Sequence, residues 1–153
     1  MTHNQQTAVL WVLGGLVYYP MEGLFHIITN GGWAWVGMVV IGGLCFVLVG
    51  AMNQRRWFYT APMWYQCLAG TIVILLVEFV SGCILNLWLG LRIWDYSRLP
   101  LNVCGQICLP FAALWFLLVP VAVWLEDQLR ARLWHEGKRY TLGSIYRELF
   151  TGR

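Results

Sequence analysis

The chain has 153 residues and a formal net charge of +3, and 59% of its residues are hydrophobic whereas only 11% are charged. A soluble domain carries roughly 25% charged residues, so this composition excludes an ordinary soluble protein. The small positive charge follows the placement of arginines around the apolar segments and does not indicate nucleic-acid binding.

Four apolar stretches take up most of the chain, at residues 8–28, 33–52, 63–89 and 103–125. Each has about the 20 residues that a helix needs to cross roughly 30 Å of hydrocarbon. Apolar runs of this length without a polar face are typical of transmembrane helices and not of the core helices of a globular protein. The sequence therefore predicts an all-α integral membrane four-helix bundle over residues 1–129, followed by a cytoplasmic amphipathic tail at 130–153.

The basic residues predict the orientation of these spans. With four spans, the N-terminus, the loop at 53–62 and the C-terminal tail share one side, which holds most of the basic residues. By the positive-inside rule this side is the cytoplasm, so we expect a multi-pass protein of the cell membrane with both termini cytoplasmic. Only Arg92 and Arg98 lie on the other side. The basic residues on the predicted cytoplasmic side are Arg55, Arg56, Arg130, Arg132, Lys138, Arg139, Arg147 and Arg153.

The first apolar stretch contains a carboxylate within the predicted bilayer. Glu22 and His26 are four residues apart and therefore share a helix face, toward the outer end of the span. An acidic residue at the centre of a span costs roughly 2.5–3.5 kcal/mol on insertion scales, so it needs a partner, a proton or water. We therefore take both residues as candidate binding residues.

The third apolar stretch carries a second carboxylate. Glu78 lies near its middle and shares a helix face with Asn86, about two turns further along. The polar residues of the first and third stretches thus run toward the same predicted outer surface.

The connection at residues 90–110 concentrates polar and aromatic side chains where the chain leaves and re-enters the bilayer. A passive connector needs only a few turn residues, and polar groups at this depth are costly unless they pair or face water. The sequence therefore predicts one polar cavity that opens outward between the first, third and fourth spans. The alternative is a buried network that only fixes helix packing. Together with Glu22, His26, Glu78 and Asn86, the candidate binding residues are Arg92, Trp94, Asp95, Tyr96, Asn102 and Gln106.

The chain changes character beyond residue 125. Apolar residues recur at helical spacing over 142–150, and Arg147 and Glu148 lie off that stripe. This pattern predicts a short amphipathic helix on the cytoplasmic membrane surface, or alternatively one packed against a neighbouring subunit. In either position we expect it to be peripheral to the bundle.

The sequence lacks the residue patterns that several kinds of catalytic site require. His26 has no second histidine in any span, so a zinc-type site is not indicated. Ser81 and Ser97 have no neighbouring histidine base, and there is no glycine-rich phosphate loop. We predict no catalytic residue, no metal site and no cofactor.

Three segments resemble a family of small bacterial membrane proteins. They are GGLCFVLVG at 42–50, VEFVSGCILNLWLGLRIWDYS at 77–97 and LPLNVCGQICLPFAALWFLL at 99–118. These segments are similar to the putative ABC-transporter type IV, or CmpB-like, proteins. The resemblance implies a transport permease with a glutamate in the first span and another in the third, here Glu22 and Glu78. Its later motifs match Asn86, Trp94, Asp95, Tyr96, Ser97, Asn102, Gly105 and Gln106.

The function we expect is that of a transport-related membrane protein, similar to an ABC-type permease, which binds a small solute or a lipid headgroup in the outward cavity. Two alternatives stay open. One is an intramembrane enzyme acting on a lipid or lipid-linked substrate, with Glu22 or Glu78 as general base. The other is a non-catalytic accessory or scaffold subunit. The expected partners are membrane lipids and further membrane chains, identical or different, because one copy has difficulty enclosing a translocation path.

Overall fold

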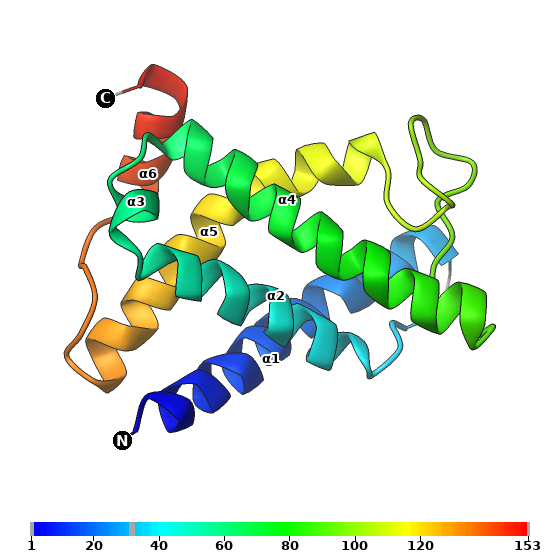
Figure 1. The fold of residues 1–153 in the computed structure, drawn as a ribbon, viewed down its shortest axis with the longest axis horizontal. Helices are drawn as coiled ribbons and strands as arrows, with labels where there is room; N and C mark the ends of the chain where they lie inside the picture. Colours follow the sequence, from blue (N-terminus) through cyan, green and yellow to red (C-terminus); the bar gives the residue numbers. More distant parts are fainter. Residues whose placement is uncertain (1, 31–32, 153) are drawn as a thin grey trace. The chain divides into compact units, whose positions relative to one another are not determined.

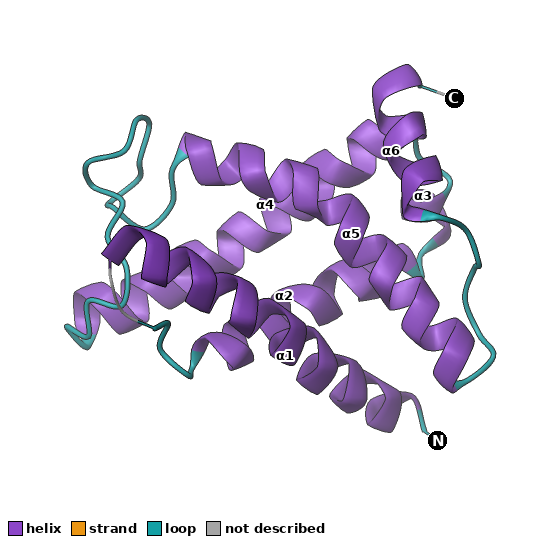
Figure 2. Ribbon diagram, turned by 180° about the vertical axis from the view of Figure 1, so that it is seen from behind, coloured by secondary structure: helices purple, strands orange, loops and turns teal. Residues whose placement is uncertain are grey.

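A computed structural model describes residues 2–30 and 33–152 of the chain. These residues form helices joined by loops (Figure 2), and the one β-type contact among them is an isolated bridge between Val103 and Ile107. The chain divides into two compact units, residues 1–48 and 49–153.

The first unit holds α1 (His3–Asn30) and the greater part of α2 (Met38–Asn53). Glycines let these two helices approach closely, since a Cβ added to Gly42 would collide with the ring of Tyr18. Small residues at helix contacts are typical of membrane proteins, where close backbone approach replaces the hydrophobic effect as the source of stability.

The helix α2 differs most from the predicted spans. The apolar stretch from residue 33 predicts a helix of bilayer length, whereas α2 begins only at Met38 and has 16 residues. Such a helix rises about 24 Å, which is less than the roughly 30 Å of a hydrocarbon core. Among the described residues, three helices are long and apolar enough to cross a membrane: His3–Ile27, Met63–Trp88 and Leu109–Leu133. The all-α fold is thus confirmed, while the fourth span and the four-helix bundle stay predictions.

In the second unit, α4 (Met63–Gly82) is continued by a π-helical turn, η1 (Cys83–Trp88). Pro62 directly precedes α4, as the preference of proline for helix beginnings predicts. The segment crosses and contacts α5 (Leu109–Leu133), and the connection from residue 89 to 108 forms a loop between the end of η1 and the beginning of α5 (Figure 1).

The helix α5 is displaced along the chain relative to the predicted span at 103–125. Its first expected residues fold back on themselves, because the amide of Val103 donates to the carbonyl of Ile107 (2.9 Å). Asn102 and Gln106, expected at the beginning of this span, therefore lie in the connection. At its other end α5 continues to Leu133, past residues 126–130, whose polar side chains find partners within the protein.

The tail forms α6 (Leu142–Thr151), the amphipathic helix that the sequence predicts. The amide of Ser144 donates to the side chain of Thr141 at its beginning (3.2 Å). The expectation that α6 is peripheral is wrong, because Ile145 is buried against Met63 and Cys67 of α4. Figure 1 shows α6 beside the beginning of α4. A short helix, α3 (Arg56–Tyr59), precedes α4.

Candidate functional site

The connection between η1 and α5 is held together by hydrogen bonds of its own. The amide of Tyr96 donates to the carbonyl of Gly105 (2.8 Å). Asn102 Nδ2 donates to the carbonyls of Ser97 (3.1 Å) and Leu99 (2.9 Å), and its Oδ1 accepts from the amide of Gly105 (3.2 Å). These bonds make the connection a fixed structure and not a passive link.

Three residues of this connection other than glycine adopt the left-handed backbone conformation. They are Arg92 (φ 50°), Leu101 (φ 50°) and Cys104 (φ 53°). Each such residue costs of order 1–3 kcal/mol and persists only where its surroundings hold it, which is why these conformations gather at binding and active sites.

A buried pair of amide side chains forms the centre of the site. Asn86, carried by η1, donates from Nδ2 to Gln106 Oε1 (2.8 Å), and both side chains are buried. Asn86 Oδ1 accepts from the amide of Ile93 (2.7 Å), and Gln106 Nε2 donates to the carbonyl of Cys104 (2.9 Å). The indole of Trp94 donates to the carbonyl of Gln106 (3.1 Å). A buried network satisfied in this way is rigid, and π-helical turns such as η1 occur frequently at functional sites.

A cavity of about 510 Å³ lies beside this amide pair. Its volume falls within the roughly 300–1,000 Å³ of small-molecule sites. Its wall combines one cation, one carboxylate, a thiol, two amides and an indole, so it can receive a polar or charged group. The cavity is lined by Asn86, Leu87, Gly90, Arg92, Trp94, Asp95, Cys104 and Gln106.

Asp95 is fixed at the edge of the cavity. Its Oδ1 accepts from the amide of Ser97 (2.8 Å). A Cβ on Gly105, whose φ is 69°, would lie 2.8 Å from the same oxygen, so this approach requires glycine. The hydrogen bonds of Ser97 lower the pKa of Asp95, and the positive charges of Arg98 and Arg92 lower it further. The carboxylate is therefore ionised at neutral pH and is a weak base.

Two of the predicted binding residues support the connection instead of lining the cavity. Asn102 links its two arms through the hydrogen bonds described above. The ring of Tyr96 stacks on Phe111 in the first turn of α5, with ring centroids 4.5 Å apart and planes inclined by 18°. Tyr96 thus attaches the connection to the helix that follows it.

Glu78 is buried in α4, about two turns before Asn86, and is not among the residues that line the cavity.

Glu22 and His26 belong to the first unit. Glu22 Oε1 lies 3.4 Å from His26 Nε2, so the spacing of four residues brings them together as predicted. The hydroxyl of Tyr18, which the sequence analysis did not include, donates to Glu22 Oε2 (2.8 Å). Because α1 and the cavity belong to different units, a single site joining Glu22, Glu78 and the connection stays a prediction.

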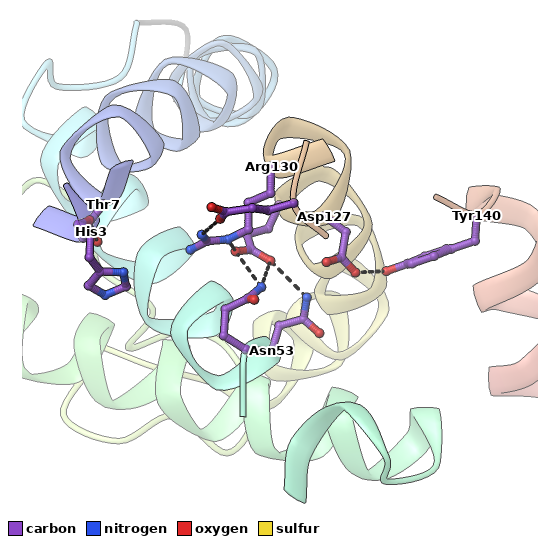
Figure 3. A network of polar contacts seen from close by, with 9 residues as sticks. His3, Thr7, Asn53, Asp127, Arg130 and Tyr140 are labelled. Carbon is purple, nitrogen blue, oxygen red and sulfur yellow. Dashed lines mark hydrogen bonds and ion pairs between the residues drawn. The ribbon is translucent and has the colours of Figure 1, made fainter. Parts of the chain in front are cut away.

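A second polar network, absent from the sequence analysis, lies toward the end of α5 (Figure 3). Glu126, only 1% exposed, pairs with Arg130 one turn further along. Glu126 Oε2 accepts from Asn53 Nδ2 (3.0 Å) and from Gln54 Nε2 (3.0 Å). The hydroxyl of Tyr140 donates to Asp127 Oδ2 (2.7 Å). The sequence does carry one signal of this network, namely the i, i+4 spacing of an acid and an arginine at the end of an apolar stretch.

The described part of the chain brings no three histidine, cysteine, aspartate or glutamate side chains together in a manner that could hold a metal ion. The side chains that line the 510 Å³ cavity can offer hydrogen bonds and charge pairing to a ligand.

Among the described residues, three helices are long and apolar enough to span a bilayer, and one of them ends beside a polar cavity, which is the pattern of a membrane protein. Residues 8–147 match the model of the family described as "Putative ABC-transporter type IV". The chain belongs to this family, which confirms the resemblance seen in its sequence motifs. No curated protein and no solved structure matches the chain.

Proposed function

We propose that this protein is a transport-related membrane protein, similar to an ABC-type permease, whose cavity at the η1–α5 connection binds an anionic small solute or the anionic part of a lipid headgroup. The family description and the three apolar helices support a role in transport. The observation that carries the binding proposal is the position of Arg92, held in a left-handed conformation in the wall of a cavity that also contains the buried Asn86–Gln106 pair.

The charges around the cavity favour an anion. Arg92 and Asp95 are its charged lining residues, but the Asp95 carboxylate accepts a hydrogen bond from the Ser97 amide and lies near two cations, Arg98 and Arg92. These two guanidinium groups outnumber the one carboxylate, and of the two only Arg92 lines the cavity, so its guanidinium is the group that can pair with a ligand. Guanidinium groups pair with carboxylate and phosphate through two parallel hydrogen bonds, which suits either ligand class.

The lining supports binding better than catalysis. A general base that works near neutral pH needs a pKa close to that pH. The one carboxylate of the wall, Asp95, has a lowered pKa, and neither Glu22 nor Glu78 is among the lining residues. An intramembrane enzyme is thus the weaker proposal. Translocation itself would require further chains, identical or different, beside this one.

The test compares Arg92→Gln with the matched control Arg98→Gln, which removes the same charge from an exposed residue that is not among those lining the cavity. Each protein is purified in mild detergent, and its copurifying metabolites and lipids are quantified by mass spectrometry. We expect an anionic compound that is enriched with the wild type and with Arg98→Gln and depleted with Arg92→Gln. The same compounds in the same amounts from all three proteins would refute the proposal.

A further inference from the structure

A second cavity, of about 460 Å³, lies where α6 packs against the beginning of α4 and the latter half of α5. Side chains of both charges line it: the carboxylates Asp127 and Glu148 and the cations Lys138 and Arg147. It shares no lining residue with the cavity at the η1–α5 connection. It is therefore a separate place at which a dipolar ligand could bind.

The inner wall of this cavity is a rigid pair of Asp127 and Tyr140. Asp127 is only 4% exposed, and its Oδ2 accepts from the Tyr140 hydroxyl (2.7 Å). The carbonyl of Tyr140 is itself held by the indole of Trp124 (3.1 Å) and by Gln128 Nε2 (3.2 Å). Burial, and then the hydrogen bond to Asp127, raise the pKa of Tyr140, so its phenol keeps its proton and donates to the carboxylate.

A close backbone approach fixes the cation at the rim. Gly137 has φ 85°, and a Cβ there would lie 2.8 Å from the carbonyl oxygen of Asp127. The α5–α6 connection thus runs directly against the last turns of α5. The next residue, Lys138, places its Nζ over the ring of Tyr59, 4.0 Å from the centroid. The backbone contact between residue 137 and Asp127 thus holds the Lys138 cation and the buried Asp127 carboxylate in one cavity.

Aromatic side chains around the cavity indicate its depth in a membrane. Trp57, Tyr59, Trp64 and Tyr65 are exposed, and they lie in α3 and in the first turn of α4. Tryptophan and tyrosine are enriched at the level of the lipid headgroups, and α4 begins a segment of bilayer length. The cavity therefore lies where lipid headgroups would be.

We propose that this cavity binds the phosphoethanolamine headgroup of a membrane lipid. The phosphate would pair with Lys138 and Arg147, and the primary ammonium would donate hydrogen bonds to Asp127 and Glu148. A phosphocholine headgroup has no N–H to donate, and the Tyr59 face that could receive its trimethylammonium group is covered by Lys138. A phosphoglycerol headgroup has no ammonium to pair with Asp127. The site is independent of the function proposed for the other cavity.

The test measures lipid binding by native mass spectrometry of the full chain released from detergent. Phosphatidylethanolamine, phosphatidylcholine and phosphatidylglycerol with identical acyl chains are titrated separately. We expect the wild type to bind phosphatidylethanolamine about tenfold more tightly than either other lipid, the effect of one or two charge-assisted hydrogen bonds. Asp127→Asn should reduce this preference to about twofold.

Further variants distinguish the contribution of the phosphate group to binding from that of the ammonium group. The double variant Lys138→Gln, Arg147→Gln should weaken binding of phosphatidylethanolamine and phosphatidylglycerol, whereas Arg139→Gln, an exposed cation outside the cavity lining, should change neither. Equal binding of phosphatidylglycerol and phosphatidylethanolamine by the wild type would overturn the proposal, and this comparison needs no variant to fold. Soluble glycerophosphoethanolamine that binds as tightly as the lipid would overturn the assignment to a membrane lipid.

Discussion

Gln106 is the residue through which the cavity at the η1–α5 connection is joined to the helices. Its side chain bonds to Asn86 of η1, its carbonyl accepts from the Trp94 indole, and Gly82 of α4 leaves room for it. The sequence predicts Gln106 as a ligand-binding residue. In the structure its amide is engaged within the protein, so its first role is to shape the cavity wall.

Substituting Gly82 tests this role. In Gly82→Ala the new Cβ would collide with Gln106 Oε1 and lie 3.0 Å from Gln106 Cβ. Gln106 would then have to give up its bonds to Asn86 and to the Cys104 carbonyl. We expect a loss of about 1–3 kcal/mol in the free energy of unfolding, as for other overpacked sites. Gly143→Ala, where a Cβ meets nothing within 4 Å, should be neutral or slightly stabilising. Thermal unfolding in detergent measures the stability of both variants. Equal midpoints for Gly82→Ala and Gly143→Ala would contradict the role of Gln106 in shaping the cavity wall.

Asp95 makes the connection sensitive to acid. Its pKa is lowered in the folded protein from the ordinary 3.8, chiefly by the hydrogen bonds of Ser97. A carboxylate with a depressed pKa contributes stability above its unfolded pKa, and this contribution is lost as the pH falls through its folded pKa. Below about pH 4 the amides of residues 94–106 should therefore lose protection, so that their exchange becomes faster relative to the intrinsic exchange rate at the same pH. Asp95→Asn should abolish this pH dependence. Hydrogen-exchange mass spectrometry decides it, and an unchanged profile in the variant would assign the effect to another group.

At the scale of the elements, α6 is part of the second unit and not an independent tail. Ile145 is 4% exposed and packs with Met63 and Cys67, whereas Phe150 on the same helix is 73% exposed. Ile145→Ala should cost about 2–4 kcal/mol, as for large-to-small changes in a packed core, and Phe150→Ala should cost almost nothing. Chemical unfolding in detergent compares the two variants. A peripheral α6 would give the same small effect for both.

The apolar stretches of the sequence predict the bounds of a helix well where a proline or a glycine marks its beginning or end. The third apolar stretch, at 63–89, predicts a span, and the chain forms a helical segment over Met63–Trp88, with Pro62 before it and Gly90 after it. The fourth was misplaced because residues 103–108 are as apolar as a span, although a backbone bond between Val103 and Ile107 folds them into the connection. Composition does not distinguish an apolar loop from an apolar helix.

The part of the candidate site whose residues lie close together along the chain could be predicted from the sequence. Asn86, Arg92, Trp94, Asp95 and Gln106 lie within 21 consecutive residues of the sequence, so their clustering is local, and the structure places all five in one cavity lining. The network of Glu126 could not be found in this way, because its partner Asn53 is 73 residues distant along the chain. Which residues meet over that distance depends on how α4 and α5 pack.

At the scale of the whole molecule, the second unit carries its two cavities at opposite ends of one helical segment. Met63 lines one cavity and Asn86 the other. The 23 steps along the chain from Met63 to Asn86 span about 34 Å at 1.5 Å per residue, close to the thickness of the hydrocarbon core of a bilayer. With the membrane orientation that the arginines predict, the cavity at the η1–α5 connection would face outward and the cavity beside α6 would face the cytoplasm.

The labelling of Cys104 tests the central claim, a water-accessible cavity at the outer end of a membrane-spanning segment. Cys104 is exposed and lines this cavity.

In a variant whose other four cysteines are replaced by alanine, a membrane-impermeant maleimide is added to sealed cells. As the control, Thr60→Cys together with Cys104→Ala places one exposed thiol at the opposite end of the segment. We predict that Cys104 is labelled from outside and that the control is labelled only after permeabilisation. A Cys104 that reacts only in permeabilised cells, or not at all, would contradict an outward-facing polar cavity.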